Sequence, residues 1–270
     1  MSQIALLPHR GVISITGPDR IAFLNGLVSN DVGRAALGQA IWAALLTPQG
    51  RYLADFFVFS DGERLLLDVA REAIPELVQK LRRFKLRAKI EVADVSDTLQ
   101  TYAIWQGTAP DSTLTAADPR LLQAGSRCLS AQTMACTASW HDYATHRLTL
   151  GLPDGPPDLE PGKTLLLEAG FDELNGIDWQ KGCYMGQELT ARTKYRGLVK
   201  RRLLPVTLDQ EHPVGTPILA NEQEVGSLRS SAGAHGLAML SLNALTQPLS
   251  LAGTALQVHI PGWVKQPDLT

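Results

Sequence analysis

The segment KGCYMGQELTAR (181–192) holds one of only three cysteines in the 270-residue chain. Cys183 follows Lys181 and stands among glycines and polar residues, whereas a structural cysteine usually has apolar neighbours. A neighbouring cation stabilises a thiolate, and a thiolate is both a nucleophile and a soft metal ligand. The pattern therefore indicates that Cys183 reacts or ligates, and a small residue packed between glycines is the structural alternative.

The remaining sequence offers no other catalytic or metal-binding motif around this cysteine. Cys128, Cys136 and Cys183 form no CxxC pair and are odd in number, which argues against a disulfide framework and against a self-contained zinc or iron-sulfur site. The chain contains no GxGxxG, GxSxG or HExxH motif, and its six histidines are scattered. PGKT (161–164) imitates the end of a phosphate-binding loop, but Pro157 stands where that loop needs glycine. We predict three reduced thiols and no resident metal.

Charged residues are distributed unevenly near Cys183. Residues 151–180 contain seven acids and one base, and residues 192–202 contain six bases and no acid. The basic strip is either a solvated edge or a track for carboxylates, phosphates or a nucleic-acid backbone. The net charge of −2 and the pI near 6.3 provide no global attraction to nucleic acid or to an acidic membrane, so we expect no membrane partner and no direct nucleic-acid binding.

Strands outnumber helices in the expected secondary structure. Strand patterns at 11–17, 40–48, 52–60 and 64–70 and helical spacing at 18–31 and 72–87 do not alternate regularly, which favours an α+β fold. The proline- and glycine-rich segment 151–163 is predicted to be a surface connection. Short strands separated by turn residues after position 200 predict a small β-barrel.

The longest motif resembles a known family. LLLEAGFDELNGIDWQKGCYMGQELTARTKYRGLVKRRL (165–203) is similar to the signature of the YgfZ family of folate-binding proteins, which are related to the glycine cleavage T protein. SITGPDRIAFLNGLVSNDV (14–32), LLTPQGRYLADFFVF (45–59) and VGSLRSS (225–231) also resemble T proteins. The resemblance implies ferredoxin-like α+β units in two interleaved lobes over residues 1–200, and a small β-barrel over residues 201–270.

The resemblance also implies a channel for tetrahydrofolate or one of its one-carbon derivatives. Glu168 is the leading candidate to accept two hydrogen bonds from the pterin edge. Asp55 matches the catalytic aspartate of T proteins, and burial would raise its pKa near the N5 atom of the folate. Ala54 replaces one of the paired acids of T proteins, which weakens the case for a transferase. The expected catalytic residues are Cys183 and Asp55, and the expected folate-binding residues are Glu168, Asp55, Tyr184, Gln187, Arg192, Lys194 and Arg196.

The resemblance implies, as the preferred function, a tetrahydrofolate-binding accessory protein for iron-sulfur cluster assembly or repair. Its expected partners are folate and iron-sulfur client or assembly proteins, with clients such as tRNA-modifying radical methylthiotransferases. A folate-dependent aminomethyl or one-carbon transferase is the alternative, and an RNA-binding module using residues 192–202 is the third. No arginine-rich or apolar leader pattern precedes the first expected strand, and the longest apolar run, at 40–46, is far shorter than the ~20 residues of a membrane span, so we expect a cytoplasmic protein.

Overall fold

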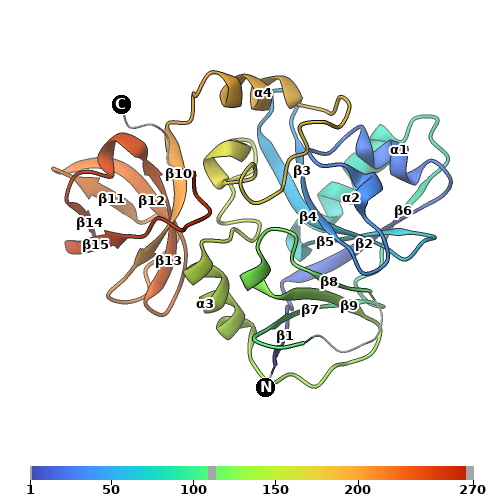
Figure 1. The fold of residues 1–270 in the computed structure, drawn as a ribbon, viewed down its shortest axis with the longest axis horizontal. Coiled ribbons are helices and arrows are strands. Elements are labelled where there is room, and N and C mark those ends of the chain that lie inside the picture. Colours follow the sequence, from blue (N-terminus) through green and yellow to red (C-terminus); the bar gives the residue numbers. More distant parts are fainter. Residues whose placement is uncertain (1, 109–113, 266–270) are drawn as a thin grey trace.

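A five-stranded antiparallel sheet forms the first unit of the computed structural model, which describes residues 2–108 and 114–265 (Figure 1). Side chains alternate between the two faces of a strand, and both faces of this sheet are buried. Phe56 and Val58 pack with helix residues such as Leu24 and Leu77, while Phe57 faces the central core. In sheet order the strands are β3 (Ile41–Leu46), β4 (Tyr52–Ser60), β5 (Leu65–Ala70), β2 (Arg10–Thr16) and β6 (Glu91–Asp94), and the helices are α1 (Arg20–Asn25) and α2 (Ile74–Phe84).

The second unit is a four-stranded antiparallel sheet with one helix. Its order is β1 (Gln3–Leu6), β7 (Gln100–Trp105), β9 (Ser126–Ser130) and β8 (Leu114–Ala117). Helix α3 (Trp140–Leu150) starts at a capping box made by Ser139 and Asp142. Because β1 precedes the first unit in the chain and β7 follows it, the two units are interleaved in sequence.

The third unit is a closed six-stranded barrel, as the sequence predicted. Its order is β10 (Arg201–Thr207), β13 (His235–Ser241), β12 (Gln223–Ala232), β11 (Pro217–Ala220), β14 (Leu249–Leu251) and β15 (Thr254–Val258). Helix α3 lies between the barrel and the four-stranded sheet (Figure 1). The predicted combination of α+β units with a C-terminal barrel is thus confirmed.

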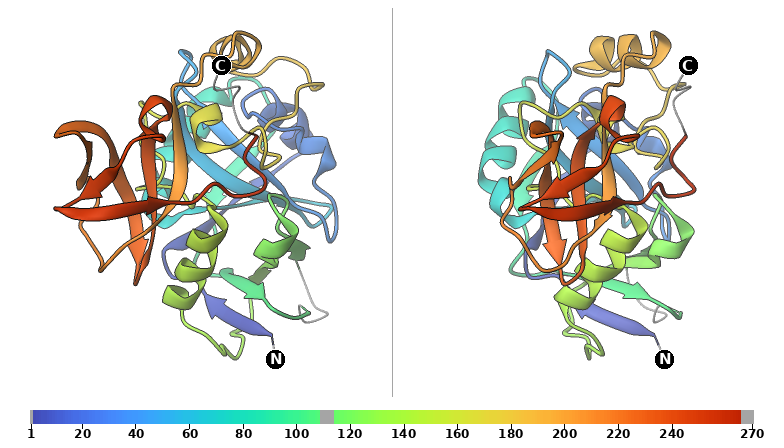
Figure 2. Two further views of the ribbon diagram at one scale, coloured as in Figure 1. Left: turned by 60° about the vertical axis from the view of Figure 1, so that its left-hand side comes forward. Right: turned by 90° about the vertical axis from the view of Figure 1, so that its left-hand side faces the viewer.

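Residues 151–200 link these units and carry α4 (Gln187–Tyr195). Figure 2 shows α4 at the end of the molecule opposite the four-stranded sheet. The prediction that 151–163 is a surface connection is wrong for residues 151–155, 158 and 159, which are buried. Asp154 is buried within the ion pairs described below, and Asp158 is paired with Arg147 at 2.6 Å. Short 3-10 turns are η1 (Val32–Arg34), η2 (Arg71–Ala73), η3 (Leu122–Ala124), η4 (Leu166–Ala169) and η5 (Leu242–Ala244).

Candidate functional site

Cys183 lies on a short arch, residues 182–185, which we call the cysteine arch. Its thiol is exposed, whereas the neighbouring Tyr184 is buried beneath the arch. In the described part of the chain, no hydrogen bond or ion pair reaches the sulfur of Cys183. A soft, exposed thiol on a surface turn is accessible to a metal cluster or to an electrophile.

Both ends of the cysteine arch are fixed by long-range contacts. Before the arch, the Lys181 ammonium donates hydrogen bonds of 2.6 Å to the carbonyl oxygens of Asn25, the last residue of α1, and Val28, three residues later. After the arch, Gly186 has φ +81°, and its Cα packs so closely on the turn between β3 and β4 that an added Cβ would lie 2.6 Å from the Thr47 oxygen. The sequence suggested that Lys181 stabilises a thiolate, but its ammonium is directed to backbone carbonyls instead.

Desolvation lowers the pKa of Lys181 to about 8, although Asp31 and Asp178 oppose that change. The Lys181 ammonium also lies 5.1 Å from the ring centroid of Tyr184. Burial has the opposite effect on Tyr184, because it disfavours the charged phenolate: it raises the pKa of Tyr184 to about 12, against a smaller opposing contribution from Thr190. The Tyr184 side chain is buried and packs with apolar residues of the central core.

Asp55 points from β4 into the central core, on the same face as Phe57. It is 2% exposed, and its two oxygens accept hydrogen bonds from the Trp42 indole at 2.9 Å and the Tyr52 hydroxyl at 2.7 Å. Burial raises the pKa of Asp55, and Arg10 offsets part of that rise. The Trp42 ring is stacked on Phe171 at 3.8 Å between centroids. Side chains of the protein thus surround the carboxyl group that was expected beside a folate.

Glu168 lies in η4 and is also buried. Its oxygens accept hydrogen bonds from Arg201 at 3.1 and 3.0 Å, and Oε2 is 3.4 Å from the Leu165 amide nitrogen. The carboxylate that was expected to bind the pterin edge is thus already paired. Asp55 and Glu168 share no hydrogen-bond partner among the described residues.

The acidic segment 151–180 and the basic strip 192–202 neutralise each other in part. Three cations of the strip form ion pairs with acids of that segment: Lys194 with Asp172, Arg201 with Glu168, and Arg202 with Glu173. The Lys194 ammonium also lies 4.0 Å from the ring centroid of Trp179. Arg192 and Arg196 are exposed, and the Gln187 side chain turns back toward the Tyr184 amide at 3.4 Å. Half of the strip therefore serves the fold.

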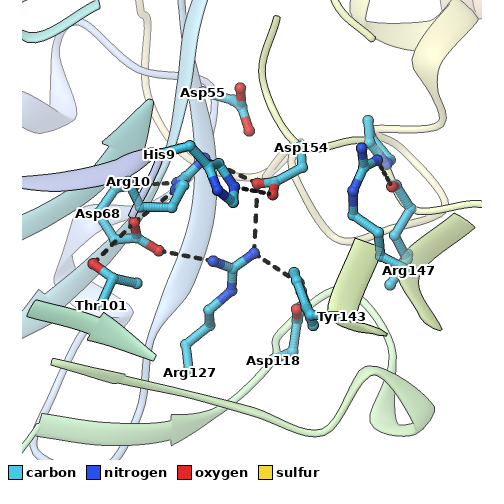
Figure 3. Close-up of polar contacts among 12 residues, drawn as sticks. His9, Arg10, Asp55, Asp68, Thr101, Asp118, Arg127, Tyr143, Arg147 and Asp154 are labelled. Carbon is cyan, nitrogen blue, oxygen red and sulfur yellow. Dashed lines mark hydrogen bonds and ion pairs between the residues drawn. The ribbon is translucent and has the colours of Figure 1, made fainter. Parts of the chain in front are cut away.

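A buried ionic cluster joins the first two units, and the sequence reasoning missed it (Figure 3). Arg10 donates to Asp68 at 2.8 Å and to Asp154 at 2.9 Å, and Arg127 lies 3.3 Å from Asp68 and 3.5 Å from Asp154. All four side chains are nearly inaccessible to solvent. Burial alone would raise the pKa of Asp154, but Arg10 and Arg127 hold it well below its usual value. Charged residues inside otherwise apolar strands, as in RGVISIT and LLLDVA, were the available signal.

Two adjoining surface grooves of about 360 and 440 Å³ lie beside this cluster and share Glu72 and Pro156. Asp154 lines one of them, but neither Asp55 nor Glu168 lines either groove. Within residues 2–108 and 114–265, no three histidine, cysteine or acidic side chains gather in a way that could hold a metal ion. In the same residues, no helix is long and apolar enough to cross a membrane.

Comparisons with known proteins identify relatives over nearly the whole chain. The chain is 34% identical to a protein named "Iron-sulfur cluster assembly factor IBA57 homolog, mitochondrial" from Mycosarcoma maydis, covering 94% of the chain and 67% of that protein. It is 30% identical to human mitochondrial IBA57 over 95% of the chain and 84% of that protein. It spans 63% of the homologue from Coccidioides immitis, at 32% identity. The family "CAF17, C-terminal beta-barrel domain" matches residues 200–266.

The fold also matches a solved structure. The glycine cleavage system aminomethyltransferase T from Bartonella henselae superposes with a TM-score of 0.74, covering 97% of this chain and 86% of that one, at 14% identity. At this identity the match establishes the fold alone. The predicted T-protein-like fold is confirmed, and the relatives found by sequence carry the name IBA57 rather than YgfZ.

The predicted cytoplasmic location is wrong. The named relatives are all mitochondrial proteins. The prediction rested on overall composition and on the first residues of the sequence, and neither property specifies a compartment.

Proposed function

Because the chain belongs to the IBA57 family of iron-sulfur cluster assembly factors, we propose that it supports the assembly of iron-sulfur proteins. The sequence identity to human IBA57 over 84% of that protein is the observation that carries this proposal. The exposed thiol of Cys183, in the most distinctive motif of the chain, gives it a chemical basis.

We assign to Cys183 the role of one ligand to a cluster that the protein passes on. The cluster is cargo, and its iron atoms exchange thiolate ligands without a change of oxidation state. When Cys183 binds iron, its thiol releases a proton and one previous ligand leaves the metal. Because a cluster iron needs several sulfur ligands, the other donors would come from an assembly protein, a client or a small thiol.

The tetrahydrofolate part of the predicted function does not fit the predicted residues well. Asp55 is enclosed by Trp42 and Tyr52, and the oxygens of Glu168 are paired with Arg201. The proposed function therefore does not use folate, and the aminomethyl-transfer alternative loses Asp55 as its expected acid-base group. Calorimetric titration of tetrahydrofolate under anaerobic, reducing conditions tests this point. We expect no saturable binding, and binding that is lost in Glu168→Ala would restore the folate hypothesis.

A complementation experiment tests the proposed function. The chain, carrying a mitochondrial leader, replaces IBA57 in human cells that lack it, and the activities of iron-sulfur enzymes are measured. If radical tRNA methylthiotransferases are among the clients, their modified nucleosides should respond in the same cells. Wild type should restore the activities, and failure to do so at normal protein abundance would reject the proposal.

Two cysteine variants then isolate the role of the arch. Cys136 is the matched control because it is also a free, exposed cysteine. We expect Cys136→Ser to restore activity like wild type, and Cys183→Ser to fall short by about tenfold or more, the scale expected for a metal-site residue. Equal restoration by both variants would remove Cys183 from the mechanism.

A further inference from the structure

The lysine of the KGCYMGQE motif makes contacts that its sequence position does not reveal. Lys181 is half-buried, and its ammonium reaches back more than 150 residues to two carbonyl oxygens near the end of α1. The last carbonyls of a helix have no partner within the helix, so a cation there both satisfies them and interacts favourably with the helix dipole. Two of the three ammonium donors of Lys181 are used in this way.

We infer that Lys181 is a positioning residue, which holds the cysteine arch against α1 through these two hydrogen bonds. The inference rests on the proposed function in one respect only: the position of Cys183 matters for function because the thiol is proposed to bind a cluster. The hydrogen bonds of Lys181 exist whether or not a cluster binds.

The segment leading to the arch supports this inference. Residues 175–178 are joined to residues 29–30 by three further hydrogen bonds. The Ser29 hydroxyl donates to the backbone oxygen of Gly176 at 2.6 Å, and the side-chain amide of Asn30 donates to the backbone oxygen of Asn175 at 2.8 Å. The backbone amide of Asp178 donates to the backbone oxygen of Ser29 at 3.0 Å. Lys181 is the last of these connections before the chain turns outward. Its loss should therefore loosen the arch and leave the preceding segment in place.

The contacts after the arch make the expected effect local. Gly186 packs its backbone on Gly50 and Thr47, and α4 begins at the next residue. The arch is thus held at both ends, with the buried Tyr184 between them. Releasing one end frees a few residues, whereas the fold of the surrounding units keeps its own hydrogen bonds.

The test compares Lys181→Met with Lys181→Arg in the metal-free full chain. Lys181→Met removes both the donors and the charge, and the guanidinium of Lys181→Arg keeps donors and charge. Amide hydrogen exchange at positions 181 and 184, whose backbone amides donate to Asp178 and Gln187, reports the mobility of the arch.

We expect Lys181→Met to accelerate exchange in the arch by about tenfold or more, the scale of losing charge-assisted hydrogen bonds. Lys181→Arg should retain most of the protection. Unchanged exchange in a folded Lys181→Met variant would overturn the inference.

If Lys181→Met does not fold, Lys181→Ala, which also removes the donors and the charge, replaces it with the same expected increase in exchange. Because these measurements use no iron, they do not depend on complementation. If the wild-type chain fails in IBA57-deficient cells, the proposed function is rejected while the exchange data still decide the role of Lys181.

Discussion

The substitution Asp68→Asn tests whether the buried ionic cluster stabilises the junction of the two sheet units. The cluster holds two cations, Arg10 and Arg127, and two anions, Asp68 and Asp154, so its charges balance. Asparagine has nearly the shape of aspartate but no charge. The variant therefore leaves one buried positive charge without a counterion. Its amide nitrogen would also take the place of an oxygen that lies 3.3 Å from an Arg127 nitrogen, so that two donors face each other.

The expected cost follows from the burial of the cluster. Breaking a buried ion pair on one side costs about 3 to 5 kcal/mol, because the remaining charge is poorly solvated. A loss of about 4 kcal/mol changes the folding equilibrium constant by nearly a thousandfold, which is a large part of the ~5 to 15 kcal/mol that stabilises a typical protein. The matched control is Glu76→Gln, which removes an exposed pair with Lys80 at 3.5 Å and should cost under about 1 kcal/mol.

Urea denaturation, followed by tryptophan fluorescence and circular dichroism, measures both variants. The double variant Asp68→Asn/Arg127→Met restores the charge balance, since Arg10 and Asp154 remain paired. It should cost less than the sum of the two single substitutions by about 1 kcal/mol or more, as expected for contacting residues. The reasoning is refuted if Asp68→Asn loses no more stability than Glu76→Gln, or if the two substitutions are simply additive.

Three further predictions concern the arch and two buried carboxyl groups. Gly186→Ala should lower the free energy of unfolding in urea by on the order of 2 to 3 kcal/mol, because the added Cβ would meet backbone atoms and the φ of +81° strains alanine. Gly182→Ala is the control, and it should change little because its Cβ would face open space. The pKa of Asp154 is depressed in the folded state, so its ionised carboxylate contributes fully to stability above the unfolded pKa of about 4, and this contribution is lost as the pH falls below that value. The wild type should therefore lose stability between pH 4 and 2 more steeply than Asp154→Asn. Burial raises the pKa of Asp55, so ionisation of Asp55 opposes folding as the pH rises above the unfolded value of about 4. The stability of Asp55→Asn relative to wild type should therefore increase as the pH rises above about 4, and a difference that does not change with pH would contradict the raised pKa.

The parts of the fold that local patterns specify could be predicted from the sequence. The hairpin of β3 and β4, helix α2 and the strands of the barrel each have a period and turn residues within a short window. The expected helix at 18–31 is shorter in the structure, Arg20–Asn25, and ends at Gly26, a poor helix former. The family motif located Cys183, and the structure exposes its thiol.

The contacts of the buried charges could not be predicted, because their partners are far apart in the sequence. Arg10 meets Asp68 across 58 residues and Asp154 across 144. The composition of segment 151–163 predicts turns, and turns are usually exposed, but composition carries no information about the arginines that hold Asp154 inside. Likewise, the spacing of Lys181 and Cys183 suggested a direct electrostatic contact, and only the position of α1 shows where the ammonium goes.

These long-range contacts have a common physical basis in the irregular segment 151–186. A chain without strands or long helices forms few hydrogen bonds of its own, so its buried polar groups must be satisfied by neighbouring elements. At the start of the segment, Asp154 accepts hydrogen bonds from arginines of both sheets, and at its end Lys181 donates to carbonyl groups near α1. The position of the exposed thiol therefore depends on residues outside the motif that contains it, and substitutions near α1 should affect Cys183 as strongly as many substitutions within KGCYMGQE.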